Sequence, residues 1–502
     1  MFRKTLLSCA LVSALAAPAL ITPAQAADPI TIRIGHQSMC TDTYPAGVVM
    51  KGLNLLQKYL PHTGKYAHAT YDVEWSDYSS GAPITQMMLA KKLDFGVMGD
   101  YPLVVNGARF QATAKERSYL IAMTNYNLTG AGNGIVVPAN SPAKSVRDLE
   151  GKAISVPIGS AAWGMLFEMA QDEHIPIDKF NIVNQDPMVG IASIATHKIA
   201  AHADFCPMSE YMEYNGTGRM IYSGASTGIP YLHGVVVTKA FADQYPEIVT
   251  AYVEALIAAQ KWIRADPMRA STMMAKWTMI PKEVFYLYFS NGGYLHADPT
   301  LKPKWLETLA FDHGILAKYA HIPALDMKSW VNSTYIEAAY QKLGLDYAKA
   351  LAAPPHDPKA DADRNPELWI AGKGIKAYPD NEALLAAMRA AGPAKEKIDA
   401  GYVYDHDSGL KLFAQYAYYV AAPGQKMLAF MTEGEAARAA GKTGKAMDFA
   451  TALAAPDMVA ALTKHPQMPM KMGSDMNMSD MPVSVQTQLG VQKQVEMQMK
   501  RN

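Results

Sequence analysis

Residues 71–99, YDVEWSDYSSGAPITQMMLAKKLDFGVMG, contain the pattern that decides the fold. YDVEWSDY and LDFGVMG have the composition of strands, and PITQMMLAKK between them has that of a helix. Upstream, residues 30–36 (ITIRIGH) alternate apolar and polar side chains as a strand does, and residues 46–60 have helical spacing. This β-α-β-α-β alternation predicts a mostly parallel sheet with helices on both faces.

The same alternation restarts after residue 133. GIVVP and AISVPIG predict strands, residues 161–173 a helix, and a later strand leads into HADFCPM at residues 202–208. HGVVVT, residues 233–238, then returns the chain towards the first sheet. The fold class is therefore α/β, with two lobes joined by crossing strands. We expect lobe I at about 27–133 and 235–353 and lobe II at about 134–234.

The two ends of the chain have different compositions. MFRK, an apolar run and AQA predict a cleavable signal peptide over residues 1–26; the apolar run is shorter than the ~20 residues of a membrane span and is broken by Pro18. Residues 354–374 are rich in Pro, Asp and Ala and predict a linker. Residues 375–455 predict a small α+β domain, and residues 456–502 a disordered, methionine-rich tail.

Charge and cysteine content exclude several classes of protein. The formal net charge is zero and no basic patch stands out, so a nucleic-acid partner is not expected. Of the three cysteines, Cys9 lies in the predicted signal peptide, which leaves Cys40 and Cys206. Two thiols are too few for a disulfide framework, so the cores must be stable without one. We expect an exported monomer, located in the periplasm.

A ligand site is expected at the strand ends. In doubly wound sheets, ligands bind beyond the carboxyl ends of the strands. Four predicted loops meet that rule, at residues 35–43, 98–102, 158–163 and 204–211. Gly159 and Ser160 open a helix there, so they offer backbone N–H groups to an anion or form an ordinary N-cap. No set of nucleophile, base and orienting group with a recognisable spacing is found, so we expect a binding protein rather than an enzyme.

The order of these motifs resembles the periplasmic solute-binding proteins of nitrate/sulfonate/taurine ABC importers. The resemblance rests on VEWSDYSSGAPITQMMLAKKLDFGVMGDYP, VVPANSPAKSVRDLEGKAISVPIGSAAW and HADFCPMSEYMEYNGTGRMI, and covers about residues 30–350. It implies a two-lobed protein, type II-like, that closes over a small ligand and delivers it to an ABC permease in the inner membrane without a required cofactor. Together with the topology, it implies a set of ligand-binding positions: His36, Met39, Cys40, Thr41, Gly99, Asp100, Tyr101, Gly159, Ser160, Trp163, Cys206, Met208 and His233.

The residues expected in the cleft depart from that family. Cys206 stands where relatives often have an aromatic residue, and the first loop contains Met39 and Cys40. Thiolate and thioether groups select soft ions such as Cu(I), so one hypothesis is a site for copper or a copper chelate formed by Cys40, Cys206, Met39 and Met208. A second is a disulfide between Cys40 and Cys206, and a third is that both thiols are buried packing groups.

The C-terminal region adds two further indications of copper. Residues 378–454 resemble the nitrous-oxide-reductase accessory (NosL) family of small periplasmic copper-binding proteins, through YVYDHDSG, AYYV, KMLAFM and EGEAARAAGK. That resemblance implies Met427 as a metal-site residue, although the family's upstream cysteine motif is absent; His406 is an alternative ligand. In the tail, Met-x-Met units supply thioethers for a soft ion, at Met468, Met470, Met472, Met476 and Met478.

Four functions stay open at this stage. The first is the substrate-binding component of an ABC importer whose ligand is copper or a copper chelate. The second keeps that role but binds nitrate, a sulfonate, taurine or a similar small anion, with a separate copper-handling C-terminal domain. The third is a periplasmic copper chaperone. The fourth is an enzyme of thiamine-pyrimidine synthesis, which the single cysteines and the predicted export disfavour.

Overall fold

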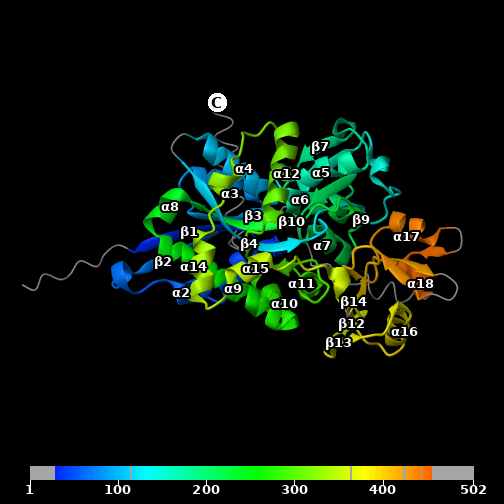
Figure 1. Ribbon diagram of the computed structural model, residues 1–502. Coiled ribbons are helices and arrows are strands. Elements are labelled where there is room, and N and C mark those ends of the chain that lie inside the picture. Colours follow the sequence, from blue (N-terminus) through cyan, green and yellow to red (C-terminus); the bar gives the residue numbers. More distant parts are fainter. Residues whose placement is uncertain (1–28, 114–115, 362–363, 422–425, 442–443, 455–502) are drawn as a thin grey trace, which may run out of the picture.

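The chain folds into two α/β lobes followed by a C-terminal region with two small sheets (Figure 1). The computed structural model describes residues 29–113, 116–361, 364–421, 426–441 and 444–454. The predicted signal peptide and the methionine-rich tail lie outside the described residues. Within the described part, no helix is long and apolar enough to cross a membrane.

Lobe I is built on a six-stranded sheet. Its order is β11-β4-β10-β3-β1-β2, with the strands β1 (Ile30–His36), β2 (Tyr71–Asp77), β3 (Phe95–Gly99), β4 (Ser118–Asn127), β10 (Tyr231–Thr238) and β11 (His296–Ala297). β1 pairs in parallel with β2 and β3, as expected. β10, however, pairs antiparallel with β3 and β4, and β11 pairs antiparallel with β4. The sheet is therefore mixed rather than mostly parallel, because β10 enters it from the other lobe.

Lobe II is built on a five-stranded sheet. Its order is β7-β6-β8-β5-β9, with the strands β5 (Gly134–Pro138), β6 (Ala153–Val156), β7 (Asn181–Asn184), β8 (Ala201–Asp204) and β9 (Gly218–Ser223). β6 pairs in parallel with β7 and β8, whereas β5 pairs antiparallel with β8 and β9. Three helices belong to this lobe: α5 (Ala161–Asp172), α6 (Pro187–Ala195) and α7 (Met208–Tyr214).

Helices cover both faces of the first sheet (Figure 1). The longest is α9 (Pro246–Ala265), and its fully buried residues Ile248, Tyr252, Leu256 and Ala259 recur at the spacing of one helical face. The others are α3 (Gly81–Leu89), α4 (Asp100–Ala112), α8 (Lys239–Gln244), α10 (Pro267–Trp277), α11 (Lys282–Phe289), α12 (Pro303–Tyr319), α13 (Met327–Trp330), α14 (Thr334–Lys342) and α15 (Tyr347–Ala352).

The prediction of a single helix over residues 46–60 is wrong. The structure has a 3-10 helix at Thr41–Ala46 (η1), then α1 (Val48–Gly52) and α2 (Leu55–Tyr59). Asn54 separates α1 from α2 because its φ of 53° is left-handed, a conformation that interrupts a right-handed helix. The hydrophobic spacing of a helix is present over these residues, but Asn54 divides it between two short helices.

Two crossing segments join the lobes, between β4 and β5 and between β9 and β10. They touch at Gly130 and Gly224: a Cβ on Gly130 would lie 2.6 Å from the carbonyl oxygen of Gly224, and a Cβ on Gly224 would lie 2.4 Å from that of Gly130. Gly130 also has a φ of 100°, which side chains rarely adopt. Only glycine therefore fits where the two crossing segments meet.

The C-terminal region contains a four-stranded and a three-stranded antiparallel sheet. Their orders are β13-β12-β14-β15 and β17-β16-β18, with β12 (Glu367–Ile370), β13 (Gly374–Ala377), β14 (Ile398–Tyr404), β15 (Lys411–Phe413), β16 (Tyr418–Ala421), β17 (Leu428–Phe430) and β18 (Lys445–Met447). The helices are α16 (Asn381–Ala391), α17 (Glu433–Ala440) and α18 (Phe449–Leu453). The ordered C-terminal structure begins inside the stretch predicted as a linker, because β12 pairs with β14.

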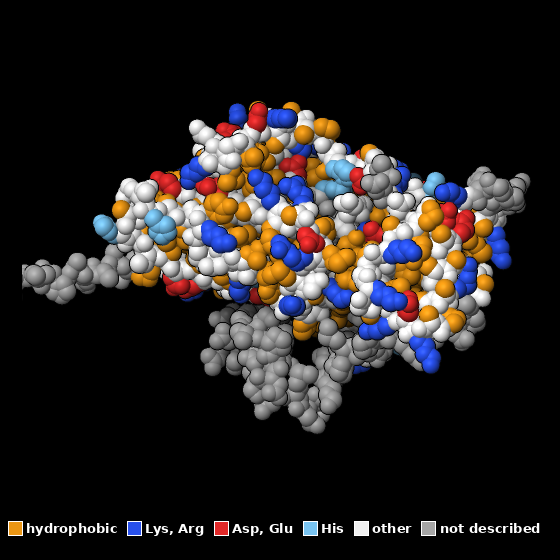
Figure 2. Space-filling view, turned by 90° about the horizontal axis from the view of Figure 1, so that it is seen from below, with side chains coloured by type: hydrophobic (Ala, Val, Ile, Leu, Met, Phe, Trp, Pro, Cys, Tyr) orange, Lys and Arg blue, Asp and Glu red, His pale blue; other side chains and the backbone are white. Residues whose placement is uncertain are grey.

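The C-terminal region contacts both lobes. On lobe I, Lys282 of α11 pairs with Asp399 at 2.9 Å. On lobe II, Lys144 pairs with Glu433 at 2.8 Å, and the rings of Tyr214 and Phe413 lie 5.3 Å apart. The face seen in Figure 2 has basic, acidic and hydrophobic side chains interspersed, as expected for a chain with no net charge.

Candidate functional site

Two thiols and one imidazole meet where the lobes face each other. The Sγ atoms of Cys40 and Cys206 lie 3.0 Å apart, and Nε2 of His233 lies 3.3 Å from Cys40 Sγ and 3.8 Å from Cys206 Sγ. All three side chains are buried, and their ligand atoms lie within 4.8 Å of one another. We call this set the thiol–imidazole cluster. Its atoms are those that soft and borderline metal ions prefer.

Each member of the cluster comes from a different part of the fold. Cys40 follows β1 and precedes η1, Cys206 follows β8 of lobe II, and His233 lies on β10 of lobe I. His233 pairs with Gly99 in the sheet, and a Cβ at Gly99 would approach His233 Nε2 to 3.3 Å. Strand ends from both lobes therefore supply the cluster, as the strand-end rule predicts.

Asp42 faces the imidazole with its carboxylate, an ion-pair partner that is not aligned as a hydrogen bond. Its Oδ2 atom lies 3.2 Å from Nδ1 of His233, which leaves Nε2 facing the thiols. Its backbone oxygen accepts hydrogen bonds from Thr124 Oγ1 at 2.7 Å and Asn125 Nδ2 at 2.8 Å, so the loop is held firmly. Burial alone would lower the pKa of His233, but the charges of Asp42 and Cys206 outweigh it and raise that pKa to about 10.

Burial also raises the pKa of both thiols. A thiolate in this dry site is costly without a neighbouring cation, because desolvation penalises the charged form. Tyr231 contributes a further polar contact, since its hydroxyl lies 3.5 Å from Cys206 Sγ. A bound metal cation would favour deprotonated thiols, because metal ligation releases their protons.

The charged groups around the cluster are acidic. The Asp100 carboxyl accepts hydrogen bonds from the backbone N–H groups of Tyr101 and Leu232. The Glu210 carboxyl accepts a hydrogen bond from the Tyr288 hydroxyl at 2.6 Å. Burial raises the pKa of Asp100 to about 6 and that of Glu210 to about 7. In the described chain, no lysine or arginine pairs with Asp42, Asp100 or Glu210.

A second group of acids joins the two lobes beside this site. The Tyr101 hydroxyl of α4 donates to Glu168 of α5 at 2.5 Å. Asp312 of α12 is buried, and neither of its carboxylate oxygens has a hydrogen-bond partner among the described residues. Burial, reinforced by Asp100 and Glu168, raises the pKa of Asp312 well above its usual value. Burial thus favours the neutral, protonated form of the Asp312 carboxyl.

Other residues predicted in the first loop lie close to the cluster in sequence. His36 is buried with neither ring nitrogen hydrogen-bonded, and burial lowers its pKa to about 4. The Thr41 hydroxyl donates to Asp42 Oδ1 at 3.0 Å. Met39 is partly buried against the core, and Met208 is fully buried at the start of α7. Ligand roles for these residues stay predictions.

The predicted loop before α5 forms a helix cap. Gly159 has a φ of 85°, and Ser160 Oγ accepts a hydrogen bond from the Trp163 backbone N–H at 3.2 Å. Trp163 packs edge-on against Phe167 with ring centroids 5.1 Å apart. The side-chain oxygen of Ser160 therefore caps α5, which is the N-cap alternative considered for this loop.

Of the C-terminal metal candidates, only Met427 and the alternative His406 are described. Met427 is partly buried, and its backbone N–H donates to Glu382 at 2.6 Å while its carbonyl accepts from Asn381 at 2.9 Å. His406 packs against the ring of Phe430 at 5.5 Å. The tail candidates lie outside the described residues: Met468, Met470, Met472, Met476 and Met478.

One arrangement was missed at the sequence level. Ser155 Oγ lies 2.8 Å from His202 Nδ1, and His202 Nε2 lies 2.9 Å from Asp204 Oδ2. The order of contacts resembles a catalytic triad, but all three side chains are fully buried in the sheet of lobe II. Because no substrate can reach the Ser155 hydroxyl there, we assign this set to the core of the lobe, where it satisfies buried polar groups.

Asp42, Glu210 and Asp312 were also missed. Asp42 had a weak signal, because it stands two residues after Cys40 in the same loop. Glu210 stands in the first turn of the helix that follows Cys206. Asp312 had no signal, because it lies on a helix distant in sequence from every predicted loop.

Comparison with known proteins agrees with this architecture. Residues 62–270 match the NMT1/THI5-like family. A putative aliphatic sulfonates-binding protein of Bacillus subtilis (strain 168) is 23% identical over 273 residues, which is 54% of this chain and 79% of that protein. The taurine-binding periplasmic protein of Escherichia coli (strain K12) is 28% identical over 198 residues, 39% of this chain and 58% of that protein, less than two thirds of its length.

Two solved structures share the fold. The alkanesulfonate-binding protein SsuA from Xanthomonas axonopodis pv. citri, bound to MOPS, superposes with a TM-score of 0.52 at 18% identity, covering 62% of this chain and 100% of that one. The nitrate-binding protein NrtA from Synechocystis PCC 6803 gives a TM-score of 0.50 at 14% identity, covering 65% and 92%. The chain thus has the two-lobed fold of periplasmic binding proteins, and its residues 62–270 carry the pattern of the NMT1/THI5-like family.

Proposed function

We propose that this protein is the periplasmic substrate-binding component of an ABC importer, and that its cargo is a soft metal ion, copper(I) or a copper chelate. The general role is supported by the similarity to sulfonate- and taurine-binding proteins. A binding role without catalysis also fits the buried state of Ser155. The assignment of a soft metal ion as cargo rests on the cleft residues of this chain. It differs from the sulfonate and taurine in the names of those relatives.

The observation that carries the proposal is the thiol–imidazole cluster. Two sulfurs and one imidazole nitrogen converge from both lobes, with Cys40 Sγ 3.0 Å from Cys206 Sγ and 3.3 Å from His233 Nε2. A cation bound by all three would cross-link lobe I to lobe II and so stabilise the closed form. Thiolates favour Cu(I) over hard ions such as Mg²⁺, which require oxygen ligands. Met39 and Met208 are candidates for further sulfur ligands.

Electrostatics argue in the same direction. The buried carboxyl groups Asp42, Asp100 and Glu210 lie around the cluster; His233 pairs with Asp42, but no lysine or arginine pairs with any of the three in the described chain. A sulfonate or nitrate ion placed there would meet like charge in a site of low dielectric. A cation would instead offset these carboxylates.

The second candidate is a binder of a sulfonate, taurine, nitrate or a similar small anion. The names of the relatives favour it, and so does the N-terminus of α5 after Gly159. In that case copper handling would belong to a separate C-terminal domain with Met427, and a third candidate, a periplasmic copper chaperone, would use the same residues. Substitution Met427→Leu would weaken copper binding under either of these two alternatives.

Titration of the chain from residue 27 with Cu(I), against a competing chelator, tests the proposal. We expect Cys40→Ser and Cys206→Ser each to abolish the binding of one tightly held equivalent of Cu(I). Met220 is a buried methionine on β9, and Met220→Leu should retain that equivalent. A variant ending at Ala455 should keep that equivalent, which separates the cleft from the tail. Unchanged copper affinity in both cysteine variants, or stabilisation by taurine or nitrate but not by copper, would overturn the cargo assignment.

A further inference from the structure

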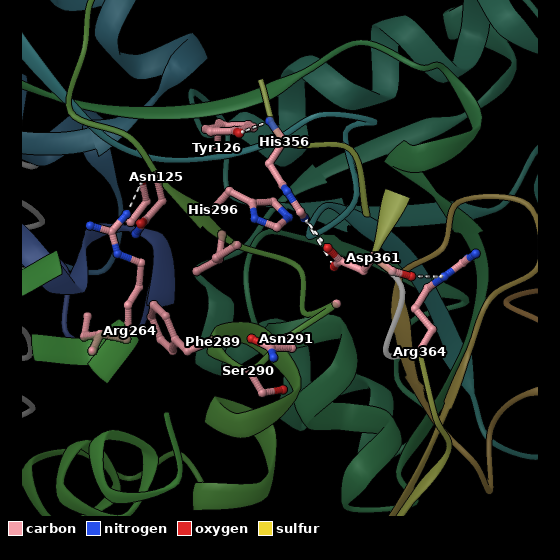
Figure 3. A pocket seen from close by; sticks show the side chains of 14 residues that line it. Asn125, Tyr126, Arg264, Phe289, Ser290, Asn291, His296, His356, Asp361 and Arg364 are labelled. Carbon is pink, nitrogen blue, oxygen red and sulfur yellow. Dashed lines mark hydrogen bonds and ion pairs between the residues drawn. The ribbon is translucent and has the colours of Figure 1, made fainter. Parts of the chain in front are cut away.

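A cavity of about 420 Å³ is lined by no residue of the thiol–imidazole cluster. It is lined by the end of β4, the end of α9, the turn after α11, β11 and residues of the segment that follows α15 (Figure 3). Its volume is within the ~300–1,000 Å³ typical of small-molecule sites. The lining combines apolar side chains with histidine, arginine, asparagine and aspartate side chains, which can recognise a polar ligand.

Two histidines lie at the centre of this cavity (Figure 3). The rings of His296 and His356 have centroids 4.1 Å apart. His356 is fixed from two sides: its Nε2 lies 3.1 and 3.2 Å from the two carboxylate oxygens of Asp361, and its backbone N–H donates to the Tyr126 hydroxyl at 2.7 Å. Asp361, the acidic residue of the lining, is thus already engaged.

His296 is left with an unused polar atom. Its Nε2 is buried and has no hydrogen-bond partner among the described residues. Burial, with the neighbouring His356, lowers the pKa of His296 to about 3, so the ring is neutral and keeps one N–H to donate. An unpaired buried nitrogen is costly, and a ligand that bonds to it would remove that cost.

Two guanidinium groups border the same cavity. Figure 3 shows Arg264 and Arg364 on opposite sides of the two histidines. Their hydrogen bonds go to backbone oxygens, from Arg264 to Ala297 at 3.2 Å and from Arg364 to Asp361 at 3.3 Å. Neither has a carboxylate partner in the described part of the chain. With His296 neutral and Asp361 paired, the lining carries an excess of positive charge.

We propose that this cavity binds a small dicarboxylate. Arg264 and Arg364 would each receive one carboxylate, because a guanidinium presents paired donors that match a carboxylate. His296 donates a hydrogen bond to the ligand, and the side chain of Asn291 supplies a further polar partner. The site is separate from the cleft and stands whether the cleft binds copper or an anion.

The wall between the two sites is Asn125. It lines the cavity, while its Nδ2 donates to the backbone oxygen of Asp42 on the other side. The two sites therefore share one residue but no ligand group. This separation allows each to be tested without disturbing the other.

Isothermal titration of the chain from residue 27 with succinate tests the proposal. We expect Arg264→Gln and Arg364→Gln each to weaken succinate binding roughly tenfold or more, because each removes a charge-assisted contact. His296→Phe should weaken it as well. The matched control is Arg109→Gln on α4, whose arginine is exposed and does not line the cavity. Circular dichroism and thermal unfolding confirm that each variant is folded.

Three outcomes would overturn the proposal. The first is no detectable succinate binding at millimolar concentration. The second is an equal loss in Arg109→Gln, which indicates non-specific attraction to positive charge. The third is tighter binding of acetate or inorganic phosphate than of succinate, which excludes recognition of two carboxylates. Cu(I) affinity, measured in parallel, should not change in Arg264→Gln, so a failure here is distinguishable from a failure of the copper proposal.

Discussion

Cys40 Sγ lies 3.0 Å from Cys206 Sγ, although the two residues are 166 positions apart and belong to different lobes. Both cysteines are free thiols and both are buried. The contact therefore exists only while the lobes face each other closely. A ligand bound by both sulfurs would therefore hold the two lobes together. For this reason the residues around the two cysteines are the first to test.

Substitution Asp42→Asn should weaken Cu(I) binding without removing a ligand. The Asp42 carboxylate lies 3.2 Å from His233 Nδ1, and its charge favours a proton on Nδ1, which leaves Nε2 towards the thiols. Loss of such a supporting carboxylate costs about ten- to hundredfold in metal affinity. Competition with a chromophoric Cu(I) chelator measures the change. The exposed Asp178→Asn should behave as wild type, and equal affinities in the two variants would show that Asp42 has no orienting role.

The meeting of Cys40, Cys206 and His233 could be predicted because it follows from topology. Each residue lies at or near the end of a strand that borders the cleft, and strand ends converge in this class of fold. Hydrophobic periodicity likewise predicted α9 and most of the strands. These features depend on local pattern and on connection rules, which one sequence contains.

Other features could not be predicted because they depend on contacts between distant segments. Asp312 reaches the acids of the cleft from α12, and no local pattern marks a helix residue as facing another lobe. The left-handed φ of Asn54 breaks a helix whose hydrophobic spacing is otherwise intact. β12 forms only because β14 pairs with it from a later part of the chain. Tertiary context decides each of these cases.

Substitution Gly130→Ala should destabilise the protein where the crossing segments touch. A Cβ would lie 2.6 Å from the Gly224 carbonyl oxygen at a φ of 100°. Backbone strain of this kind costs on the order of 1–3 kcal/mol, and the clash adds to it. Urea unfolding measures the loss. Gly344→Ala is the control, because Gly344 has a φ of 65° but open space around its Cβ position. A loss no greater than that of Gly344→Ala would contradict a tight contact.

Glu168 should make the protein less stable as pH rises. Burial raises its pKa from 4.5 to about 7, although Tyr101 donates to it from the other lobe. Between these two values the folded state keeps a proton that the unfolded state has released, so unfolding free energy falls with increasing pH. At about 1.4 kcal/mol per pH unit, the contribution is on the order of 3 kcal/mol.

Glu168→Gln removes this contribution, because glutamine has no proton to lose. The difference in unfolding free energy between about pH 5 and about pH 8 should shrink in the variant. It should not vanish, because Asp100 and Glu210 also have raised pKa values. Denaturant titrations at both pH values measure the difference. Substitution of the exposed Glu150 by Gln should leave the wild-type pH dependence, and an unchanged dependence in Glu168→Gln would mean that this carboxyl is ionised in the folded protein.

Lys411 should anchor the C-terminal region to lobe I. Its buried Nζ lies 2.7 Å from both Ser290 Oγ and Glu367 Oε2 and 4.5 Å from the ring centre of Tyr286. Lys411→Met leaves the Glu367 carboxylate without its cation, although the Tyr286 hydroxyl still donates to it at 3.3 Å, and breaking a buried ion pair in this way costs about 3 kcal/mol or more. Glu367 lies on β12, so the ion pair itself is inside the C-terminal region. Ser290 and Tyr286 belong to α11 and its end, so the variant also loses contacts that join the C-terminal region to lobe I.

Thermal unfolding and limited proteolysis measure this effect together. In Lys411→Met we expect a lower midpoint and faster cleavage between α15 and β12, because the C-terminal region loses its contact with α11. Lys373→Met is the matched control: Lys373 pairs with Glu396 on the surface, where such pairs contribute about 0–1 kcal/mol. If both variants lose the same stability, the buried lysine does not hold the regions together. If Lys411→Met alone is cleaved faster, the C-terminal region depends on this contact for its attachment to lobe I.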